Sequence, residues 1–327
     1  VLPALRINPF GLYDSNFTLD VGMVFYINLV CTAVVVLCFW RELTGFRWKF
    51  DVKLWRRMLR YALPLLVLGI AGILNQTLDK IIFPYLYGGA DEKTQLGIYG
   101  AAVKIAMIMA MITQAFRYAY EPFVFGKAKD KDNRDTYAKA MKYFIIFTLL
   151  AFLTVIAYID ILRFVIPNRS YWPGLRVVPI VMAAEIMMGV YFNLSFWYKL
   201  IDKTIYGAVF SIVGCTVLLA VNFYGIPRMS YMACAWGGFA GYGTAMVLSY
   251  IVGQKKNPIP YPMRSMAGYV LLAVVLYVLI TLVPDEWPVL LRLAAGTALV
   301  VVYAAYTVWR DMPLAGLPVI GKYFRKH

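Results

Sequence analysis

Runs of about twenty apolar residues recur along the chain, separated by short polar or basic segments. A helix of about 20 apolar residues is long enough to cross the hydrocarbon core of a bilayer. The pattern therefore predicts an all-α, polytopic transmembrane helical bundle with about nine spans. We place these spans at residues 20–40, 61–83, 98–122, 143–166, 177–198, 205–224, 231–252, 266–283 and 289–309.

Two consecutive spans, within residues 61–125, carry polar and charged side chains where hydrocarbon tolerates few of them. Ionised groups inside a membrane are costly and usually face the bundle interior or a water-filled path. These two helices therefore predict a transport pathway. The polar residues are Asn75, Gln76, Asp79 and Lys80 on the first helix, and Lys104, Gln114, Arg117 and Glu121 on the second.

The spacing of the charged residues leaves several pairings open. Counted from the outer face, Asp79 and Lys104 lie at similar depths, so they form either a neutral structural pair or one that opens to an anion or a proton. Glu185 lies eight residues into its span and is either protonated or paired with a cation such as Lys104. Arg117 and Glu121, four residues apart, form either an interfacial pair or a gate.

The formal net charge of +15 indicates topology rather than nucleic-acid binding. Of the 32 lysines and arginines, 22 lie in alternate connecting segments, namely 41–60, 126–142, 199–204, 253–265 and 310–327. The remaining connecting segments hold five. Because basic loops of membrane proteins stay in the cytoplasm, we expect these segments and the C-terminus to be cytoplasmic. We expect no nucleic-acid partner.

The composition excludes several other classes. With 62% apolar and 15% charged residues, the chain is too apolar for a soluble domain, in which about a quarter of residues are charged. The single histidine is His327, which excludes histidine-based metal sites and a Ser-His-Asp triad within this sequence. The four cysteines fall inside predicted spans without CxxC spacing. We therefore expect no metal and no cofactor.

Several motifs resemble bacterial lipid-linked oligosaccharide flippases of the O-antigen type, in the multidrug/oligosaccharidyl-lipid/polysaccharide exporter superfamily. The resemblance extends over about residues 60–250. The residues that carry it are Asn75, Asp79-Lys80, Gly97-Ile98-Tyr99, Lys104-Ile105-Ala106, Phe116, Ala119, Pro122-Phe123, Asn193-Leu194-Ser195-Phe196-Trp197-Tyr198-Lys199-Leu200, Lys203-Thr204 and Gly225-Ile226-Pro227.

The resemblance implies a division of the chain. The superfamily fold has fourteen spans in two bundles around a central cavity, and the nine spans here correspond to its sixth to fourteenth. We therefore expect that the first five spans lie outside this sequence. Residues 1–40 would be the last span of the first bundle with its outer lead-in, 41–60 a basic cytoplasmic linker, 61–309 a second bundle of eight spans, and 310–327 a basic cytoplasmic tail.

The resemblance also implies a function without enzymatic chemistry. It is to flip a polyprenyl-pyrophosphate-linked oligosaccharide across the bacterial inner (plasma) membrane during surface polysaccharide biosynthesis. We expect Lys80, Lys104 and Arg117 to contact the headgroup, and Asp79 or Glu185 to couple transport to protons or Na⁺. The expected partners are the lipid-linked oligosaccharide, membrane lipids and other proteins of polysaccharide assembly.

Three alternatives remain at the level of the sequence. A multidrug or cation antiporter of the same superfamily would have an acidic cavity in place of Lys80 and Lys104. A membrane polysaccharide polymerase or ligase would need a large outer loop, whereas the longest outer connection predicted here is about fourteen residues. A scaffold that does not transport is the third.

Overall fold

The computed structural model describes residues 21–40, 50–126, 133–201, 203–284 and 286–311. The expectations for residues 1–20 and 41–49, and for all but the first two residues of the tail 310–327, lie outside these described residues. Within the described residues the regular structure is helical and contains no strand. The predicted all-α fold is therefore confirmed.

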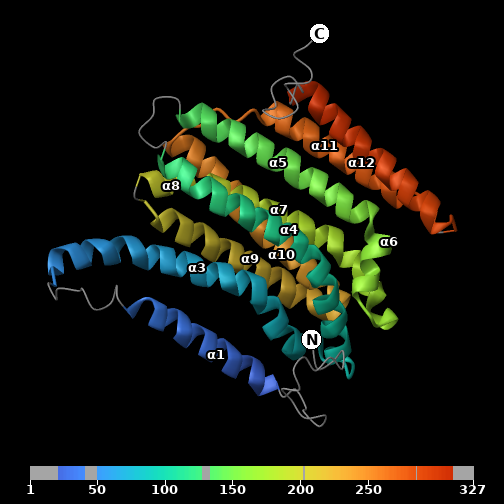
Figure 1. Ribbon diagram of the computed structural model, residues 1–327, viewed down its shortest axis with the longest axis horizontal. Coiled ribbons are helices and arrows are strands. Elements are labelled where there is room, and N and C mark those ends of the chain that lie inside the picture. Colours follow the sequence, from blue (N-terminus) through green and yellow to red (C-terminus); the bar gives the residue numbers. More distant parts are fainter. Residues whose placement is uncertain (1–20, 41–49, 127–132, 202, 285, 312–327) are drawn as a thin grey trace. The chain divides into compact units, whose positions relative to one another are not determined.

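The chain forms two compact units, Val1–Arg57 and Met58–His327. The helices of both units are shown in Figure 1. In chain order they are α1 (Val21–Cys38), α3 (Val52–Tyr87), α4 (Glu92–Gly126), α5 (Asn133–Ala157), α6 (Ile159–Leu162), η2 (Arg163–Val165), η3 (Arg169–Val177), α7 (Val178–Leu194), α8 (Phe196–Leu200), α9 (Ile205–Met229), α10 (Met232–Lys256), α11 (Met263–Thr281) and α12 (Val289–Asp311).

Six stretches of the described residues are long and apolar enough to cross a membrane. They confirm a polytopic helical membrane protein. The other three expected spans, 20–40, 61–83 and 231–252, overlap α1, α3 and α10, and their crossing stays a prediction. The six stretches are Glu92–Val124, Arg134–Ala157, Arg169–Leu200, Ile205–Met229, Met263–Thr281 and Val289–Asp311.

α3 is longer than the sequence led us to expect. It has 36 residues, about 54 Å at 1.5 Å per residue, and includes the end of the predicted linker as well as the span. The Asp51 carboxylate accepts hydrogen bonds from the backbone N–H groups of Lys53 and Leu54, at 2.8 and 3.2 Å, and so caps the helix start. Residues 52–63 contain no glycine or proline, and the helix then continues through Pro64 into the span.

A short turn at residues 88–91 connects α3 to α4. Gly88 has a φ of 65°, in the left-handed region that favours glycine. The Asp91 carboxylate accepts hydrogen bonds from the Gln95 amide at 2.7 Å and the Tyr87 hydroxyl at 3.0 Å. These bonds lower the pKa of the exposed Asp91 carboxyl. They link the end of α3 to the start of α4.

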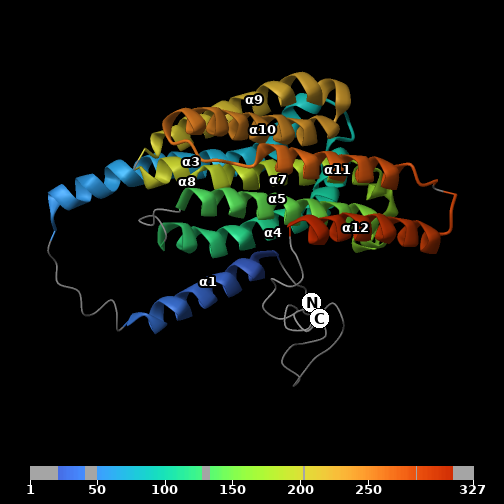
Figure 2. The same cartoon turned by 90° about the horizontal axis from the view of Figure 1, so that it is seen from above.

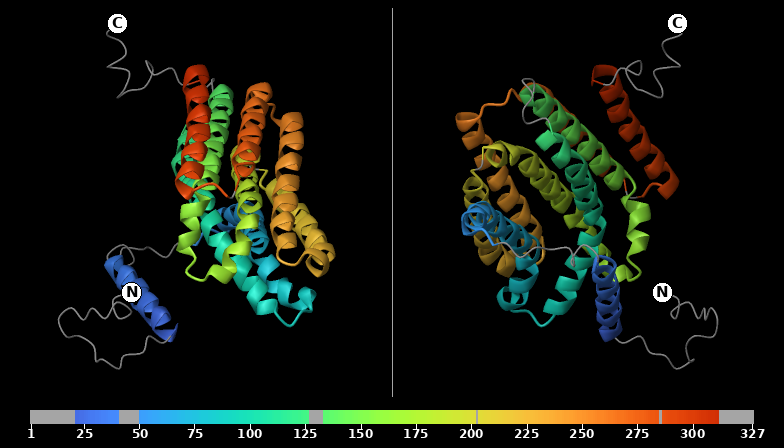
Figure 3. Two further views of the ribbon diagram at one scale, coloured as in Figure 1. Left: turned by 90° about the vertical axis from the view of Figure 1, so that its right-hand side faces the viewer. Right: turned by 60° about the vertical axis from the view of Figure 1, so that its left-hand side comes forward.

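α9 and α10 lie side by side in Figures 2 and 3. Their backbones meet at two glycines: a Cβ built on Gly214 would lie 2.7 Å from the Gly241 carbonyl oxygen, and one on Gly241 would lie 2.8 Å from the Gly214 carbonyl oxygen. Any side chain larger than hydrogen would separate the helices at this point.

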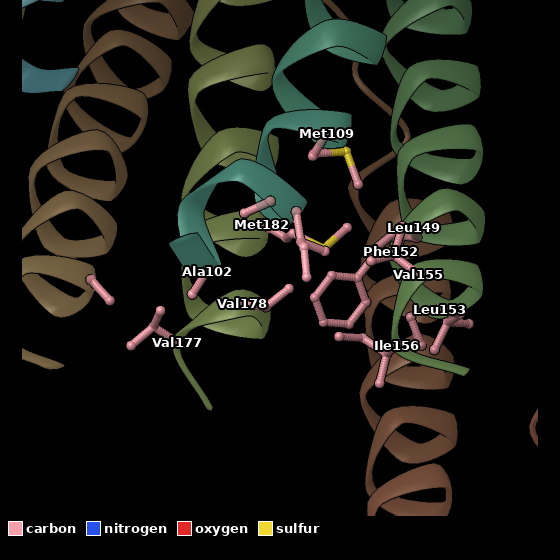
Figure 4. Packing of buried hydrophobic residues seen from close by; sticks show 14 of the residues in the cluster. Ala102, Met109, Leu149, Phe152, Leu153, Val155, Ile156, Val177, Val178 and Met182 are labelled. Carbon is pink, nitrogen blue, oxygen red and sulfur yellow. The ribbon is translucent and has the colours of Figure 1, made fainter. Parts of the chain in front are cut away.

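The hydrophobic core of the second unit lies between α4, α5 and α7. Figure 4 shows Met109 of α4, Phe152 of α5 and Met182 of α7 among these buried side chains. Lipid tails are as apolar as the side chains, so close packing rather than water exclusion stabilises such a core inside a membrane. The packing fixes α4 against α7, and both helices line the candidate site.

Ion pairs connect helices at both ends of the bundle. At the predicted outer end, the Asp160 carboxylate of α6 lies 3.2 Å from Arg163 and 2.5 Å from Arg292 of α12. The Asp160 side chain is only 8% exposed, so the arginines neutralise a nearly buried charge. At the predicted cytoplasmic end, Lys142 of α5 pairs with Asp311 of α12.

Candidate functional site

A cavity of about 720 Å³ lies between α3, α4, α7 and α10, with contributions from α8 and α9. Its volume is within the range of about 300–1,000 Å³ that is usual for ligand pockets. Gly69 and Gly72 of α3 line one side, and a Cβ built on either would meet nothing within 4 Å. The lining side chains that can form hydrogen bonds are Tyr61, Gln76, Thr113, Gln114, Arg117, Glu121, Glu185, Tyr191, Ser195, Tyr198, Lys199, Ser211 and Tyr242.

One end of the cavity is formed by three charged side chains from α4 and α8. The Lys199 ammonium donates to the Glu121 carboxylate at 3.1 Å, and the Arg117 Nε lies 3.7 Å from the other oxygen of the same carboxylate. The Lys199 side chain is 9% exposed, and those of Glu121 and Arg117 are about a third exposed. We call these three residues the cationic cluster, because two cations share one carboxylate and leave an excess positive charge.

Aromatic rings support the two cations. The Arg117 guanidinium lies 4.4 Å from the centre of the Phe192 ring, and the Lys199 ammonium lies 5.1 Å from the centre of the Phe196 ring. Ring faces attract cations and restrict their positions. The cationic cluster is therefore positioned before any ligand arrives, at the end of the cavity that the charge distribution predicts to be cytoplasmic. Arg117 and Glu121, four residues apart on α4, therefore form a cluster with Lys199 rather than an isolated pair on one helix.

Glu185 of α7 lines the cavity away from the cationic cluster. Its carboxylate forms no hydrogen bond or ion pair with any described residue, although the charge of Lys80 acts on it electrostatically. The expected pairing of Glu185 with Lys104 is therefore not formed among the described residues. The cavity contains a carboxylate that a ligand can reach.

Asp79, Lys80 and Lys104 do not line the cavity. Asp79 is buried, and its carboxylate accepts hydrogen bonds from the Tyr99 hydroxyl at 2.6 Å and from the Lys80 backbone N–H at 2.8 Å. The Lys80 ammonium donates to the carbonyl oxygen of Gln76 at 3.3 Å. Tyr99 is among the residues that carry the resemblance, but the sequence did not predict its contact with Asp79, because its neighbours along the chain are apolar or glycine.

Lys104 is exposed and forms no ion pair with a described residue, so the expected Asp79–Lys104 pair is not formed there. The physical reason is the helical period. Tyr99 and Lys104 are five residues apart on α4, which places them about 140° apart around the helix axis. When Tyr99 faces Asp79, Lys104 faces elsewhere.

Lys199 is the main functional residue that sequence reasoning did not select. Its position at the predicted cytoplasmic end of a span was a weak signal, because lysines are common at such ends. Its importance comes from a contact with Glu121, 78 residues earlier in the chain.

Comparison with known proteins gives one family. Residues 20–119 match the family model described as "polysaccharide biosynthesis protein". The matched range includes less than a third of the 327 residues and ends two residues after Arg117. It supports the superfamily that the sequence resembles, and with the apolar helices it supports a multi-pass membrane protein of polysaccharide biosynthesis. No curated protein and no solved structure matches the chain.

Proposed function

We propose that this protein flips a polyprenyl-diphosphate-linked oligosaccharide across the bacterial inner membrane, as part of surface polysaccharide assembly. The observation that supports this proposal is the cationic cluster at the cytoplasmic end of a cavity of about 720 Å³. A diphosphate is the most charged part of such a substrate, and paired cations in a partly dry cavity bind it strongly. The polyprenyl chain can stay in the bilayer.

The residues have different roles in this proposal. Arg117 and Lys199 bind the diphosphate inside the cavity. Lys104 precedes the cavity-lining Met107 by three residues on α4, so it extends the same helix face and is a headgroup contact later on the path. Lys80 is a further headgroup contact. Asp79 and Glu185 are the candidates for coupling to protons or Na⁺.

Membrane potential can drive this movement. Moving two negative charges outward, toward the positive side of a potential of about 100 mV, is favourable by about 4–5 kcal/mol at about 2.3 kcal/mol per charge. Two bundles that alternate in opening around a central site would give alternating access. The proposal therefore needs no chemical reaction by the protein itself.

The test is binding of farnesyl diphosphate, a short polyprenyl diphosphate, to the purified protein in nanodiscs. Arg117→Gln and Lys199→Gln should each weaken binding about tenfold, because each removes one cation next to the phosphates. Lys255→Gln, which removes an exposed cation at the end of α10, is the matched control and should bind as the wild type does. Equal affinity in all four proteins would contradict the proposed function.

A second function is favoured by one observation. Glu185 offers the cavity a carboxylate that has no partner among the described residues, and an organic cation would bind such a group in an antiporter of the same superfamily. Tetraphenylphosphonium is the probe for this alternative. If the wild type binds tetraphenylphosphonium but not farnesyl diphosphate, and Glu185→Gln abolishes that binding, the antiporter replaces the flippase.

A further inference from the structure

The positions of Glu185 and of the cationic cluster along the cavity follow from helix register. A Cβ on Gly174 would touch Ile98, and a Cβ on Gly189 would touch Thr113. The same offset of about 76 residues recurs, so η3 and α7 run beside α4 in the same direction. On this register Glu185 is level with Met109, eight residues before Arg117. Eight residues correspond to about 12 Å along the helix axes.

This separation sets the size of the ligand that can touch both ends. The 12 Å separates backbone levels, and both side chains extend from their helices into the cavity, so a ligand that touches both ends is shorter than about 12 Å. One hexose ring with the phosphate oxygen that carries it is of that size. The sugar bonded directly to the diphosphate can therefore reach Glu185 when the diphosphate occupies the cationic cluster.

The surroundings of Glu185 fit a neutral, hydroxyl-rich ring. Gln76, Gln114 and Tyr242 line the cavity and can exchange hydrogen bonds with sugar hydroxyls. The Thr113 hydroxyl oxygen is buried and has no hydrogen-bond partner among the described residues. Glu185 itself, when ionised, only accepts hydrogen bonds. At the position of Glu185, the cavity therefore binds ligand groups that donate hydrogen bonds.

From this geometry, and resting on the proposed function, we propose that Glu185 is a specificity-determining residue for the sugar attached to the diphosphate. It accepts hydrogen bonds from hydroxyls of a neutral sugar and rejects a uronic acid at the same position. A uronate carboxylate cannot donate to Glu185, and its charge repels the Glu185 charge inside a low-dielectric cavity; Lys80, the cation whose charge acts on Glu185, does not line the cavity.

The test compares two ligands that differ only in this group, farnesyl diphosphate glucose and farnesyl diphosphate glucuronate. Binding is measured to the full chain in nanodiscs at pH 8.5, so that the Glu185 carboxylate is ionised. The wild type should bind the glucose compound about tenfold to a hundredfold more tightly, the range expected for one repulsive charge contact. Glu185→Gln should bind both compounds equally, and Glu185→Asp should keep the preference because it keeps the charge.

The control is Glu286→Gln, which changes an exposed carboxylate in the connection between α11 and α12 and should keep the wild-type preference. Equal binding of the two compounds by the wild type would overturn the proposal, as would a preference that persists in Glu185→Gln. Binding of farnesyl diphosphate without a sugar distinguishes a failure of the Glu185 assignment from a failure of the proposed function. If that compound still depends on Arg117 and Lys199 while the sugar preference is missing, the assignment of Glu185 fails and the proposed function remains.

Discussion

Glu121 provides the sharpest test of how the cationic cluster works. Its carboxylate accepts a hydrogen bond from Lys199 at 3.1 Å and lies 3.7 Å from Arg117. It therefore partly neutralises both cations. A bound diphosphate must share these cations with a carboxylate of its own charge sign. Glu121→Gln keeps the shape of the side chain and removes that charge, so it should strengthen diphosphate binding.

The size of the effect follows from Coulomb's law. Two unit charges about 5 Å apart interact by about 1 kcal/mol at a dielectric constant of 80 and about 3 kcal/mol at 20. Glu121 is 31% exposed, so solvent screening reduces the effect toward the lower value. We therefore expect about 1–2 kcal/mol, or roughly fivefold to thirtyfold tighter binding of farnesyl diphosphate.

The assay is a binding titration of farnesyl diphosphate at two salt concentrations. The advantage of Glu121→Gln over the wild type should shrink at high salt, because salt screens partly exposed charges. Lys199→Gln should change affinity in the opposite direction. If Glu121→Gln instead weakens binding as much as Lys199→Gln does, the carboxylate orients the cations rather than opposing the ligand, and its competition with the diphosphate is refuted.

Two further predictions concern stability, both measured by thermal unfolding in detergent. Asp160→Asn should lower the free energy of unfolding by about 3–5 kcal/mol, because it leaves two partly buried arginines without their shared carboxylate; an unchanged melting temperature would contradict this. Gly214→Leu should destabilise the protein by at least about 2 kcal/mol through overpacking between α9 and α10, whereas Gly238→Ala should have little effect, since its Cβ would meet nothing within 4 Å. Similar melting temperatures for these two glycine variants would refute the close contact.

The class of fold was predictable from the sequence because it depends on local properties. Twenty apolar residues in a row must form a helix in a bilayer, since every backbone N–H and C=O group needs a partner and lipid supplies none. The boundary between linker and span was less predictable. Residues 52–60 are basic and amphipathic. The sequence does not show whether they join the span as one helix, because Pro64 follows them and can either end a helix or lie within it.

For the charged residues too, the sequence predicted local properties but not the contacts between helices. The sequence identified Arg117 and Glu185 as groups that must face something other than lipid, and both line the cavity. It did not identify their neighbours, because pairing depends on which helices are adjacent and on their register. Lys199 reaches Glu121 across 78 residues, and Tyr99 rather than Lys104 reaches Asp79 because of its angle around α4.

By itself, the sequence determined that this protein is a polytopic helical membrane protein and which residues are costly inside lipid, and it predicted which connecting segments lie in the cytoplasm. Each of these follows from a free energy of transfer, which belongs to a residue or a short segment. Only the tertiary structure decided which charges share a cavity, because electrostatic interaction depends on distances between helices that are remote along the chain. Hydropathy and composition do not contain those distances.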